Sequence, residues 1–268
     1  MEEEELAWRP VPDWEDSVAM TSPAPAQEPA VRALHATKVY GSGDTKVVAL
    51  DDLSVDFAAS EFSVIMGPSG SGKSTLMHCL AGLDRLTVGQ VFLGGVDLAM
   101  LSDKELTKLR RRNVGFVFQA FNLVPTLTAK ENITLPLDLA GTKVEPEWYD
   151  RVIDTIGLRD RLGHRPSELS GGQQQRTAIA RALITRPTVI FADEPTGNLD
   201  SRSGAEMLDF MRQAVDELGQ TIVMVTHDPN AAARGNRVVF LVDGRIVQET
   251  RDPTASYVLE TMTRLGDG

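Results

Sequence analysis

The chain has 268 residues, of which 42% are hydrophobic and 24% charged, as in a soluble globular protein with one large domain or one domain carrying an inserted lobe. Its net charge of −11 at pH 7 argues against a protein whose main task is to bind nucleic acid phosphates, although residues 108–113 (KLRRRN) form a local basic patch. The single cysteine, Cys79, excludes an internal disulfide and fits a reducing compartment.

Residues 1–30 differ in composition from the rest of the chain. Proline, alanine and acidic residues alternate there without apolar periodicity, which predicts a disordered acidic tail; Trp8 and Trp14 are the only hint that it docks anywhere. The acidic start does not look like a secretory signal, and no apolar run approaches the roughly 18–20 residues of a membrane helix. We therefore expect a cytoplasmic protein that reaches a membrane only through a partner and has no nucleic acid partner.

From Val31 onwards, short apolar runs bounded by turn residues predict β-strands in the first part of the chain. We expect strands at 31–40 and 47–57, a hairpin at 89–98, and buried strands at 61–66 and 113–119.

The strand at 61–66 leads directly into GPSGSGKST and then into a helical pattern. This order of strand, glycine loop and helix confirms a match to G-x-x-x-x-G-K-[ST], a loop whose backbone N–H groups surround phosphates. Lys73 would place its charge between the β- and γ-phosphates, and the Ser74 hydroxyl would bind Mg²⁺. Cys79, one turn into the helix, is interpreted as a small core residue rather than a reactive thiol. The nucleotide-binding residues predicted here are Gly67, Pro68, Ser69, Gly70, Ser71, Gly72, Lys73, Ser74 and Thr75.

The second half of the chain alternates helical and strand patterns, which is typical of a parallel α/β sheet. A helical stretch between about 120 and 170 interrupts this alternation, so we interpret it as an inserted lobe. We expect helices at 128–140, 147–158 and from about 170, buried strands at 188–193 and 221–227, and a hairpin at 237–249 around Asp243–Gly244.

Two carboxylates follow the apolar run 188–192. Asp193 would lie at the carboxyl end of a buried strand, where open α/β sheets bind ligands, and could hold Mg²⁺. Glu194 would then orient or deprotonate the attacking water. The alternative is an acidic loop that caps the next helix.

Three further residues end predicted strands near the same site. Gln119 could contact both Mg²⁺ and the water, and His227 could contact the γ-phosphate; each is otherwise a structural side chain. Tyr40 could stack on adenine or fill the core.

Taken together, these motifs resemble the ATP-binding cassette of ABC transporters over residues 31–250. The resemblance rests on Tyr40, the loop at 67–75, Gln119, the signature LSGGQ at 169–173, VIFADE at 189–194, NLD at 198–200, and His227. The sequences at 118–137 and 166–201 are similar to those of the subgroup of macrolide-efflux, lipoprotein-release and cell-division ATPases.

This resemblance implies a fold, a cofactor set and a domain. The fold would be α/β, a P-loop NTPase core with a mostly parallel sheet, an antiparallel β subdomain and an inserted α-helical subdomain, forming one ATPase domain over 31–268. The cofactors would be ATP and Mg²⁺, with Mg²⁺ held by Ser74, Gln119 and Asp193. Catalysis of hydrolysis would involve Glu194, His227, Lys73 and Gln119.

The resemblance also implies a second copy of the chain, because in this family the signature of one subunit faces the γ-phosphate on the P-loop of another. Ser170, Gly171, Gly172 and Gln173 would bind the neighbour's ATP at the positive end of a helix. Asp200 would reach across the same interface.

A third implication is an integral membrane permease subunit, which would hold the protein at the inner face of the cell membrane. Phe121, Leu123 and Leu127 are candidates for the groove that receives this partner, or they fill the lobe's own core. Two alternatives to an export or lipoprotein-release ATPase stay open: a mechanical or regulatory ATPase of the cell-division type, and a non-transport ATPase of DNA maintenance or translation.

Overall fold

The structure is a computed structural model that describes residues 28–266. The expected tail, with Trp8 and Trp14, falls outside the described residues up to position 27. Residues 28–30 are described, and they already belong to the folded domain: Ala30 is buried and its carbonyl accepts a hydrogen bond from the Gly94 N–H.

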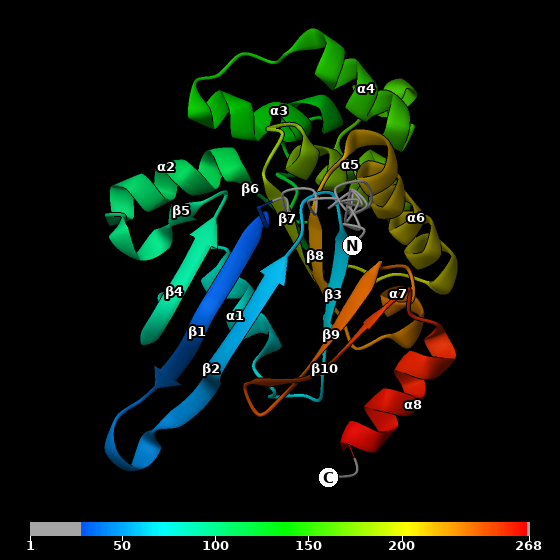
Figure 1. The fold of residues 1–268 in the computed structure, drawn as a ribbon. Helices are drawn as coiled ribbons and strands as arrows, with labels where there is room; N and C mark the ends of the chain where they lie inside the picture. Colours follow the sequence, from blue (N-terminus) through cyan, green and yellow to red (C-terminus); the bar gives the residue numbers. More distant parts are fainter. Residues whose placement is uncertain (1–27, 267–268) are drawn as a thin grey trace, which may run out of the picture.

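A six-stranded sheet forms the centre of the molecule, in the order β10-β9-β3-β8-β7-β6 (Figure 1). The strands from β9 to β6 are parallel to one another, and β10 runs antiparallel at the edge. The mostly parallel sheet expected from the sequence is therefore confirmed. The strands are β3 (Phe62–Met66), β6 (Val114–Phe118), β7 (Val189–Asp193), β8 (Ile222–Val225), β9 (Arg237–Val242) and β10 (Arg245–Arg251).

A second, antiparallel sheet has the order β2-β1-β4-β5. A short 3₁₀ turn, Gly43–Thr45, joins its two long strands, and the turn Gly94–Gly95 joins its two short ones. The antiparallel subdomain is thus also confirmed. Its strands are β1 (Val31–Tyr40), β2 (Val47–Phe57), β4 (Val88–Leu93) and β5 (Val96–Asp97).

Helices cover both faces of the central sheet, because alternate residues of its buried strands point to opposite sides. Ile65 of β3 joins a core with α1 and the antiparallel sheet, whereas Val64 and Met66 join a core with α3 to α7. The α-helices are α1 (Lys73–Leu80), α2 (Asp103–Asn113), α3 (Ala129–Ala140), α4 (Pro146–Ile156), α5 (Gly171–Leu183), α6 (Ser201–Leu218), α7 (Pro229–Ala232) and α8 (Ala255–Gly266); single 3₁₀ turns lie at Leu98–Met100, Arg159–Arg161 and Pro166–Glu168.

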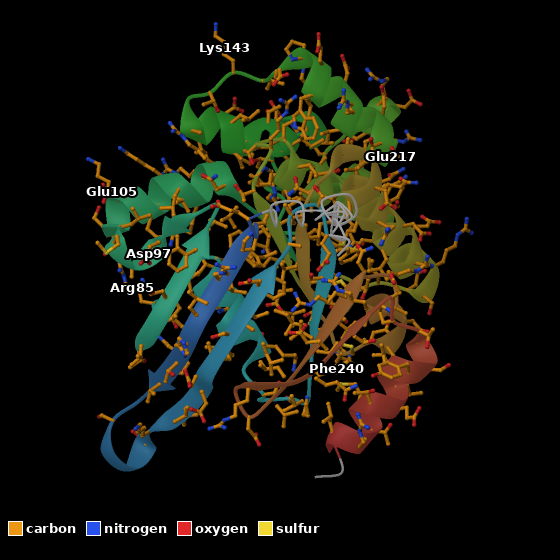
Figure 2. All side chains as sticks on the ribbon, viewed as in Figure 1. Arg85, Asp97, Glu105, Lys143, Glu217 and Phe240 are labelled. Atoms are coloured by element: carbon orange, nitrogen blue, oxygen red, sulfur yellow. The ribbon has the colours of Figure 1, made fainter. Side chains whose placement is uncertain are left out.

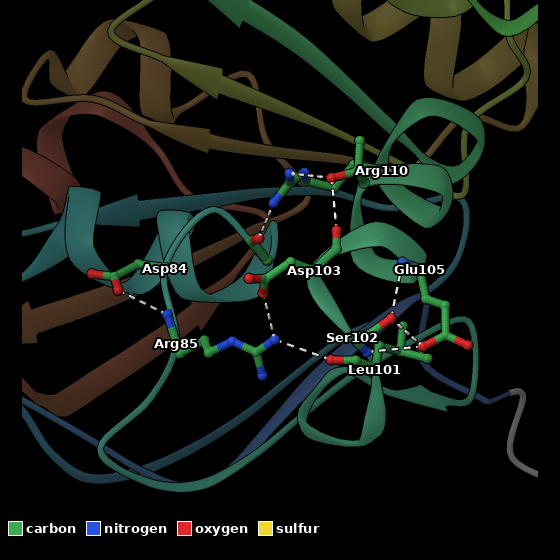
Figure 3. Close-up of polar contacts among 9 residues, drawn as sticks. Asp84, Arg85, Leu101, Ser102, Asp103, Glu105 and Arg110 are labelled. Atoms are coloured by element: carbon green, nitrogen blue, oxygen red, sulfur yellow. Dashed lines mark hydrogen bonds and ion pairs between the residues drawn. The ribbon is translucent and has the colours of Figure 1, made fainter.

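Helix α2 coincides with the basic patch noted in the sequence, and it is attached to the loop that follows α1 (Figure 3). Ser102 and Glu105 form a reciprocal capping box at its start, Arg85 bonds Asp103, and Arg110 donates to the Gly82 carbonyl. These contacts fix α2 against the loop that leaves the carboxyl end of α1.

Helices α3 and α4 lie between β6 and α5 in the chain and form the upper part of the view in Figure 1. The fully buried Asn132 holds the preceding turn through hydrogen bonds with Val124 and Leu127, and the Trp148 indole donates to the Leu183 carbonyl at the end of α5. Figure 2 shows the side chains of the described residues in the same view. Within residues 28–266 we find no helix long and apolar enough to cross a membrane.

Candidate functional site

Four parallel strands end in register at one edge of the central sheet. Ile65 pairs with Val225, Val225 with Asp193, and Asp193 with Phe118. Since neighbouring strands are about 4.8 Å apart, the residues that follow these positions come together. The sheet therefore brings together the P-loop (residues 67–75), Glu194, Thr226 with His227, and Gln119. Ligands bind at this edge of the sheet in open α/β folds. The sequence placed Gln119 and His227 at strand ends; β6 ends one residue before Gln119 and β8 two residues before His227.

The P-loop passes from β3 into α1 through backbone that only glycine tolerates. Gly67 has φ of 155°, and a Cβ atom there would lie 1.9 Å from the Leu241 carbonyl oxygen. The Ser71 hydroxyl is buried in the loop without a hydrogen-bond partner among the described residues. Together with the N–H groups of the first turn of α1, which have no intrahelical acceptor, this loop offers donors to an anion. Its residues fit a bound polyphosphate.

Lys73 lies over this loop and donates to the carbonyl oxygens of Gly67 and Pro68, at 2.9 and 2.7 Å. Burial lowers the pKa of its ammonium group, and the nearby carboxylates of Glu194 and Asp193 oppose that shift. A half-buried cation next to two carboxylates is a typical arrangement for a functional site.

Asp193 and Glu194 occupy different environments although they are neighbours in the chain. Burial raises the pKa of Asp193, with His78 and Lys73 acting against the shift. Glu194 has a φ of 45°, and its N–H donates to the Val225 carbonyl. This left-handed backbone, uncommon for a side-chain-bearing residue, directs Glu194 towards β8.

Glu194 is held by the two residues that follow β8. Its Oε1 lies 2.9 Å from His227 Nδ1, and its Oε2 accepts a hydrogen bond from the Thr226 hydroxyl at 3.4 Å. Thr226 is fully buried, whereas His227 is three-quarters exposed. The sequence predicted Glu194 and His227 for this site but missed Thr226, whose only signal was its place between a buried strand and the histidine.

Gln119 contacts the loop before α6 rather than Asp193. Its Nε2 donates to Asn198 Oδ1 at 3.1 Å, and the Asn198 amide donates back to the Gln119 carbonyl at 3.3 Å. Asn198 lies in the NLD segment, so this pair links the end of β6 to the segment that contains Asp200. The sequence noted NLD as a motif but did not predict this contact.

The signature opens α5. Ser170 is its N-cap: the hydroxyl accepts from the Gln173 N–H at 3.3 Å, and the Gln173 side chain accepts from the Ser170 N–H at 3.0 Å. Gly171 has nothing within 4 Å of the position a Cβ would take. No neighbour within the described residues therefore requires glycine at 171. Within residues 28–266 no hydrogen bond joins the signature to the P-loop.

Asp200 caps α6, next to the signature. Its carboxylate accepts from the N–H groups of Arg202 and Ser203 and from the Ser203 hydroxyl, and the Ser203 hydroxyl bond is the main reason for its lowered pKa. A Cβ atom on Gly172 would be 3.9 Å from the Ser203 hydroxyl, so the starts of α5 and α6 lie side by side. Both present N-terminal N–H groups on one part of the surface.

Tyr40 ends β1 and is 41% exposed, so the alternative of a core tyrosine does not hold. Its hydroxyl donates to Asp84 Oδ2 at 2.7 Å. Burial, followed by this bond, raises its pKa, and the Thr75 hydroxyl of the P-loop acts in the opposite direction. Tyr40 is therefore a neighbour of the P-loop.

A groove of about 430 Å³ lies between α2, β6, α3 and α5. Its walls are apolar, with Leu83 and Leu139 both largely exposed, and Arg110 and Arg111 contribute charge. Phe121, Leu123 and Leu127 do not line this groove and are not part of either buried core; they are half-buried.

A family model described as "ABC transporter" matches residues 50–197, which include the P-loop, the signature and Glu194. The chain belongs to this family. As an ABC ATPase it binds and hydrolyses ATP, and it is of the type that serves as the ATPase subunit of transporter complexes.

Relatives of the cassette agree with this assignment. An uncharacterized ABC transporter ATP-binding protein of Thermotoga maritima is 48% identical over 78% of this chain and 90% of its own length. Another, MJ0796 of Methanocaldococcus jannaschii, is 43% identical over 82% of this chain and 97% of its own. The macrolide export ATP-binding/permease protein MacB of Burkholderia thailandensis is 45% identical over 85% of this chain, but this chain spans only 35% of that protein.

Solved structures of ABC cassettes share the fold. The dimeric MJ0796 cassette in a post-hydrolysis state, bound to ADP and Pi, superposes with a TM-score of 0.72 at 41% identity, covering 83% of this chain and 99% of that one. A cbiO1 cassette from Clostridium perfringens superposes with a TM-score of 0.76 over 90% of this chain and 98% of that one, and at 24% identity it supports the fold alone. The P-loop NTPase fold expected from the sequence is confirmed.

Proposed function

We propose that this ABC ATPase powers a membrane transporter of the export or lipoprotein-release type by forming a head-to-tail dimer around two ATP molecules. The observation that carries the proposal is the start of α5. Its capped, glycine-bearing N-terminus faces outward, has no bond to its own P-loop among residues 28–266, and places donors beside the start of α6. A helix N-terminus of this kind binds anions, and the γ-phosphate on a second copy of the chain is the anion it fits.

In this dimer, each ATP lies between two chains. Lys73 and the P-loop N–H groups of one chain bind the β- and γ-phosphates, and Ser170, Gly171, Gly172 and Gln173 of the other bind the γ-phosphate from the opposite side. Asp200 reaches across the interface from its position at the start of α6. The dimeric MJ0796 cassette is a relative with this stoichiometry of chains.

Hydrolysis then depends on how Glu194 is held. With Oε1 against His227 and Oε2 against Thr226, its carboxylate is oriented to accept a proton from a water in line with the γ-phosphorus. His227 and Lys73 stabilise the charge that develops on the transferred phosphoryl group. Loss of phosphate removes the ligand shared by the two chains, and the dimer opens.

Mg²⁺ fits the oxygen donors that surround this site. The Ser74 hydroxyl, the Asp193 carboxylate and the Gln119 amide would hold it, and oxygen donors of these types suit this hard cation. When bound, it neutralises charge on the β- and γ-phosphates. Gln119 would have to exchange its contact with Asn198 for this role.

The dimer can be tested with Glu194→Gln, which keeps the shape of the side chain but removes the base. We expect this variant to bind ATP without hydrolysing it, and to elute as a dimer from size-exclusion chromatography at millimolar ATP and Mg²⁺. The same variant with Lys73→Ala is the control and should elute as a monomer. A Glu194→Gln protein that stays monomeric would refute the ATP-bridged dimer.

The groove between α2 and α3 is the surface that we assign to the permease, because exposed leucines on a concave surface are typical of protein interaction sites. A permease bound there would hold the ATPase at the inner face of the membrane. Sequence similarity to MacB, a fused ATP-binding and permease protein, favours export.

Leu139→Asp tests the groove. It should abolish stimulation of ATP hydrolysis by the permease and leave the basal rate of the isolated protein unchanged. Leu259→Asp on α8, a leucine of similar exposure, is the matched control and should affect neither rate. Normal stimulation of the Leu139→Asp protein would place the permease elsewhere.

A further inference from the structure

Asp84 is the centre of a polar network that includes Tyr40 and that the ATPase chemistry described above does not use. Asp84, in the loop after α1, accepts the Tyr40 hydroxyl on Oδ2 at 2.7 Å. Its Oδ1 accepts from Lys38 Nζ at 2.6 Å and from the Arg85 N–H at 2.8 Å. Both carboxylate oxygens are therefore occupied by partners from β1 and from the loop itself.

Lys38 makes a second contact with the tyrosine. Its Nζ lies 4.7 Å from the centre of the Tyr40 ring, over one face, and also donates to the Arg85 carbonyl at 2.7 Å. The Lys38 side chain is only 12% exposed. An ammonium group held over an aromatic face is an attractive arrangement. Tyr40 is nevertheless 41% exposed, so its ring keeps surface for another partner.

The charges of the network support one another. Burial disfavours the ionised carboxyl of Asp84, but the hydrogen bonds from Lys38, Tyr40 and Arg85 outweigh it and lower its pKa. Burial likewise opposes the charge on Lys38, but the bond to Asp84 raises its pKa. Near neutral pH the network consists of a carboxylate, an ammonium and a neutral phenol, each with a partner.

Helix α1 connects this network to the phosphates. It begins at Lys73 in the P-loop, and the loop that leaves its other end carries Asp84. A single rigid element of eight residues thus joins the phosphate-binding backbone to the group that orients Tyr40.

We propose that Asp84 and Lys38 are positioning residues for the nucleotide base: they fix the Tyr40 ring so that its free face stacks on adenine at a set distance from the P-loop. The inference rests on the expectation that Tyr40 stacks on the base. It goes beyond that expectation in two respects. Asp84 orients the ring through its hydroxyl, and Lys38 occupies one face, so that the base stacks on the other. Binding to a ring that is already oriented avoids the entropic cost of ordering it on binding.

The test compares two ligands on the full-length protein, ATP and inorganic tripolyphosphate, each titrated with Mg²⁺ present. Tripolyphosphate reports on the P-loop without a base. Tyr40→Phe keeps the ring but removes the hydroxyl that donates to Asp84. Asp84→Asn removes the carboxylate to which both Tyr40 and Lys38 donate. We expect each to weaken ATP binding about two- to tenfold, the range for one hydrogen bond, and to leave tripolyphosphate affinity unchanged.

Combining the two substitutions gives a readout that a merely structural role would not produce. Because Asp84→Asn already disturbs the bond that Tyr40→Phe removes, the double variant should weaken ATP binding no more than Asp84→Asn alone. Asp56→Asn, which breaks the Arg32–Asp56 ion pair of the same sheet, is the control and should change neither affinity. Thermal unfolding of all variants shows whether each is folded.

The outcomes separate this inference from the one on which it rests. If Tyr40→Ala leaves ATP affinity unchanged, Tyr40 does not stack on the base, and both the stacking and the positioning role are refuted. If Tyr40→Ala weakens ATP binding but Tyr40→Phe and Asp84→Asn do not, stacking stands and the positioning role is refuted. Equal weakening of ATP and tripolyphosphate by Asp84→Asn would also refute it, because Asp84 would then act on the phosphate loop.

Discussion

Among the residues that the structure describes, the Lys73 side chain forms hydrogen bonds only within the P-loop, to the carbonyl oxygens of Gly67 and Pro68. Because these bonds connect nothing outside the loop, Lys73→Ala should leave the fold intact. It should reduce ATP affinity by at least about a hundredfold, the loss expected when a charged partner of a phosphate is removed. Titration with ATP and far-UV circular dichroism measure the two effects. Unchanged affinity would contradict its role, and loss of helix signal would show that the lysine is also needed for folding.

Thr226 offers a second test at this scale, because its hydroxyl is one of two groups that hold Glu194. Thr226→Val keeps the shape but removes the donor, and should lower kcat for ATP hydrolysis about two- to tenfold, the range for one hydrogen bond, with no change in ATP affinity. Thr226→Ser restores the hydroxyl and should restore most of the rate. A Val variant with the full rate would leave His227 as the only group that matters for orienting Glu194.

The residues of the nucleotide site could be predicted from the sequence to the extent that strand ends can be recognised. A buried apolar run followed by Asp193 and Glu194, or by Thr226 and His227, shows where a strand stops. Contacts between such ends depend on the register of β6, β7 and β8, which a single sequence does not specify. For this reason the partners of Gln119 and Glu194, namely Asn198 and Thr226, became visible only in the structure.

At the scale of elements, Ser170 of the signature combines two roles that the sequence did not separate. It caps α5, and it has the proposed role of binding the neighbour's nucleotide. Ser170 caps α5 through a reciprocal pair with Gln173, and Ser102 caps α2 through the same pair with Glu105. Ser170→Ala and Ser102→Ala should each lower the free energy of unfolding by about 1 kcal/mol. Only Ser170→Ala should also reduce ATP hydrolysis, because in the proposed dimer Ser170 would face the neighbour's nucleotide and Ser102 would not.

Comparing these two alanine variants separates an effect on the rate of hydrolysis from an effect on the stability of the fold. Urea denaturation gives the loss of stability, and steady-state hydrolysis by each protein gives the rate. Equal losses of activity in both variants would show that the signature serine acts only as a helix cap.

Helix α2 also shows where prediction of the elements failed. Seven of its eleven residues are charged and only Leu106 is buried, so apolar periodicity gave no signal. Ser102 and Glu105 were the signal available, since a serine followed three residues later by a glutamate favours a helix start. Strands such as β3 and β7 were predicted because burial on both faces makes them continuously apolar.

At the scale of the whole molecule, a single chain contains one P-loop and one signature, and among residues 28–266 no hydrogen bond joins them. Gly171→Asp should therefore bind ATP nearly normally and fail to hydrolyse it, because a carboxylate would face the neighbour's γ-phosphate across the dimer interface. Its own P-loop is unchanged, and Gly171 has open space around it, so the chain should fold as before. Loss of ATP binding by this variant would mean that the glycine serves its own chain's nucleotide.

Mixing Gly171→Asp with Lys73→Ala, each inactive alone, tests the head-to-tail arrangement directly. In a mixed dimer, the intact P-loop of the first chain lies opposite the intact signature of the second, and the other site carries both defects. Random pairing should make half of the dimers mixed, so about a quarter of the wild-type rate should return if each site acts independently. A mixture that stays inactive while ATP still drives mixed dimers together would show that both sites must be intact for either to turn over. A mixture that forms no mixed dimer at all would contradict the arrangement, because the composite site would then not hold two chains together.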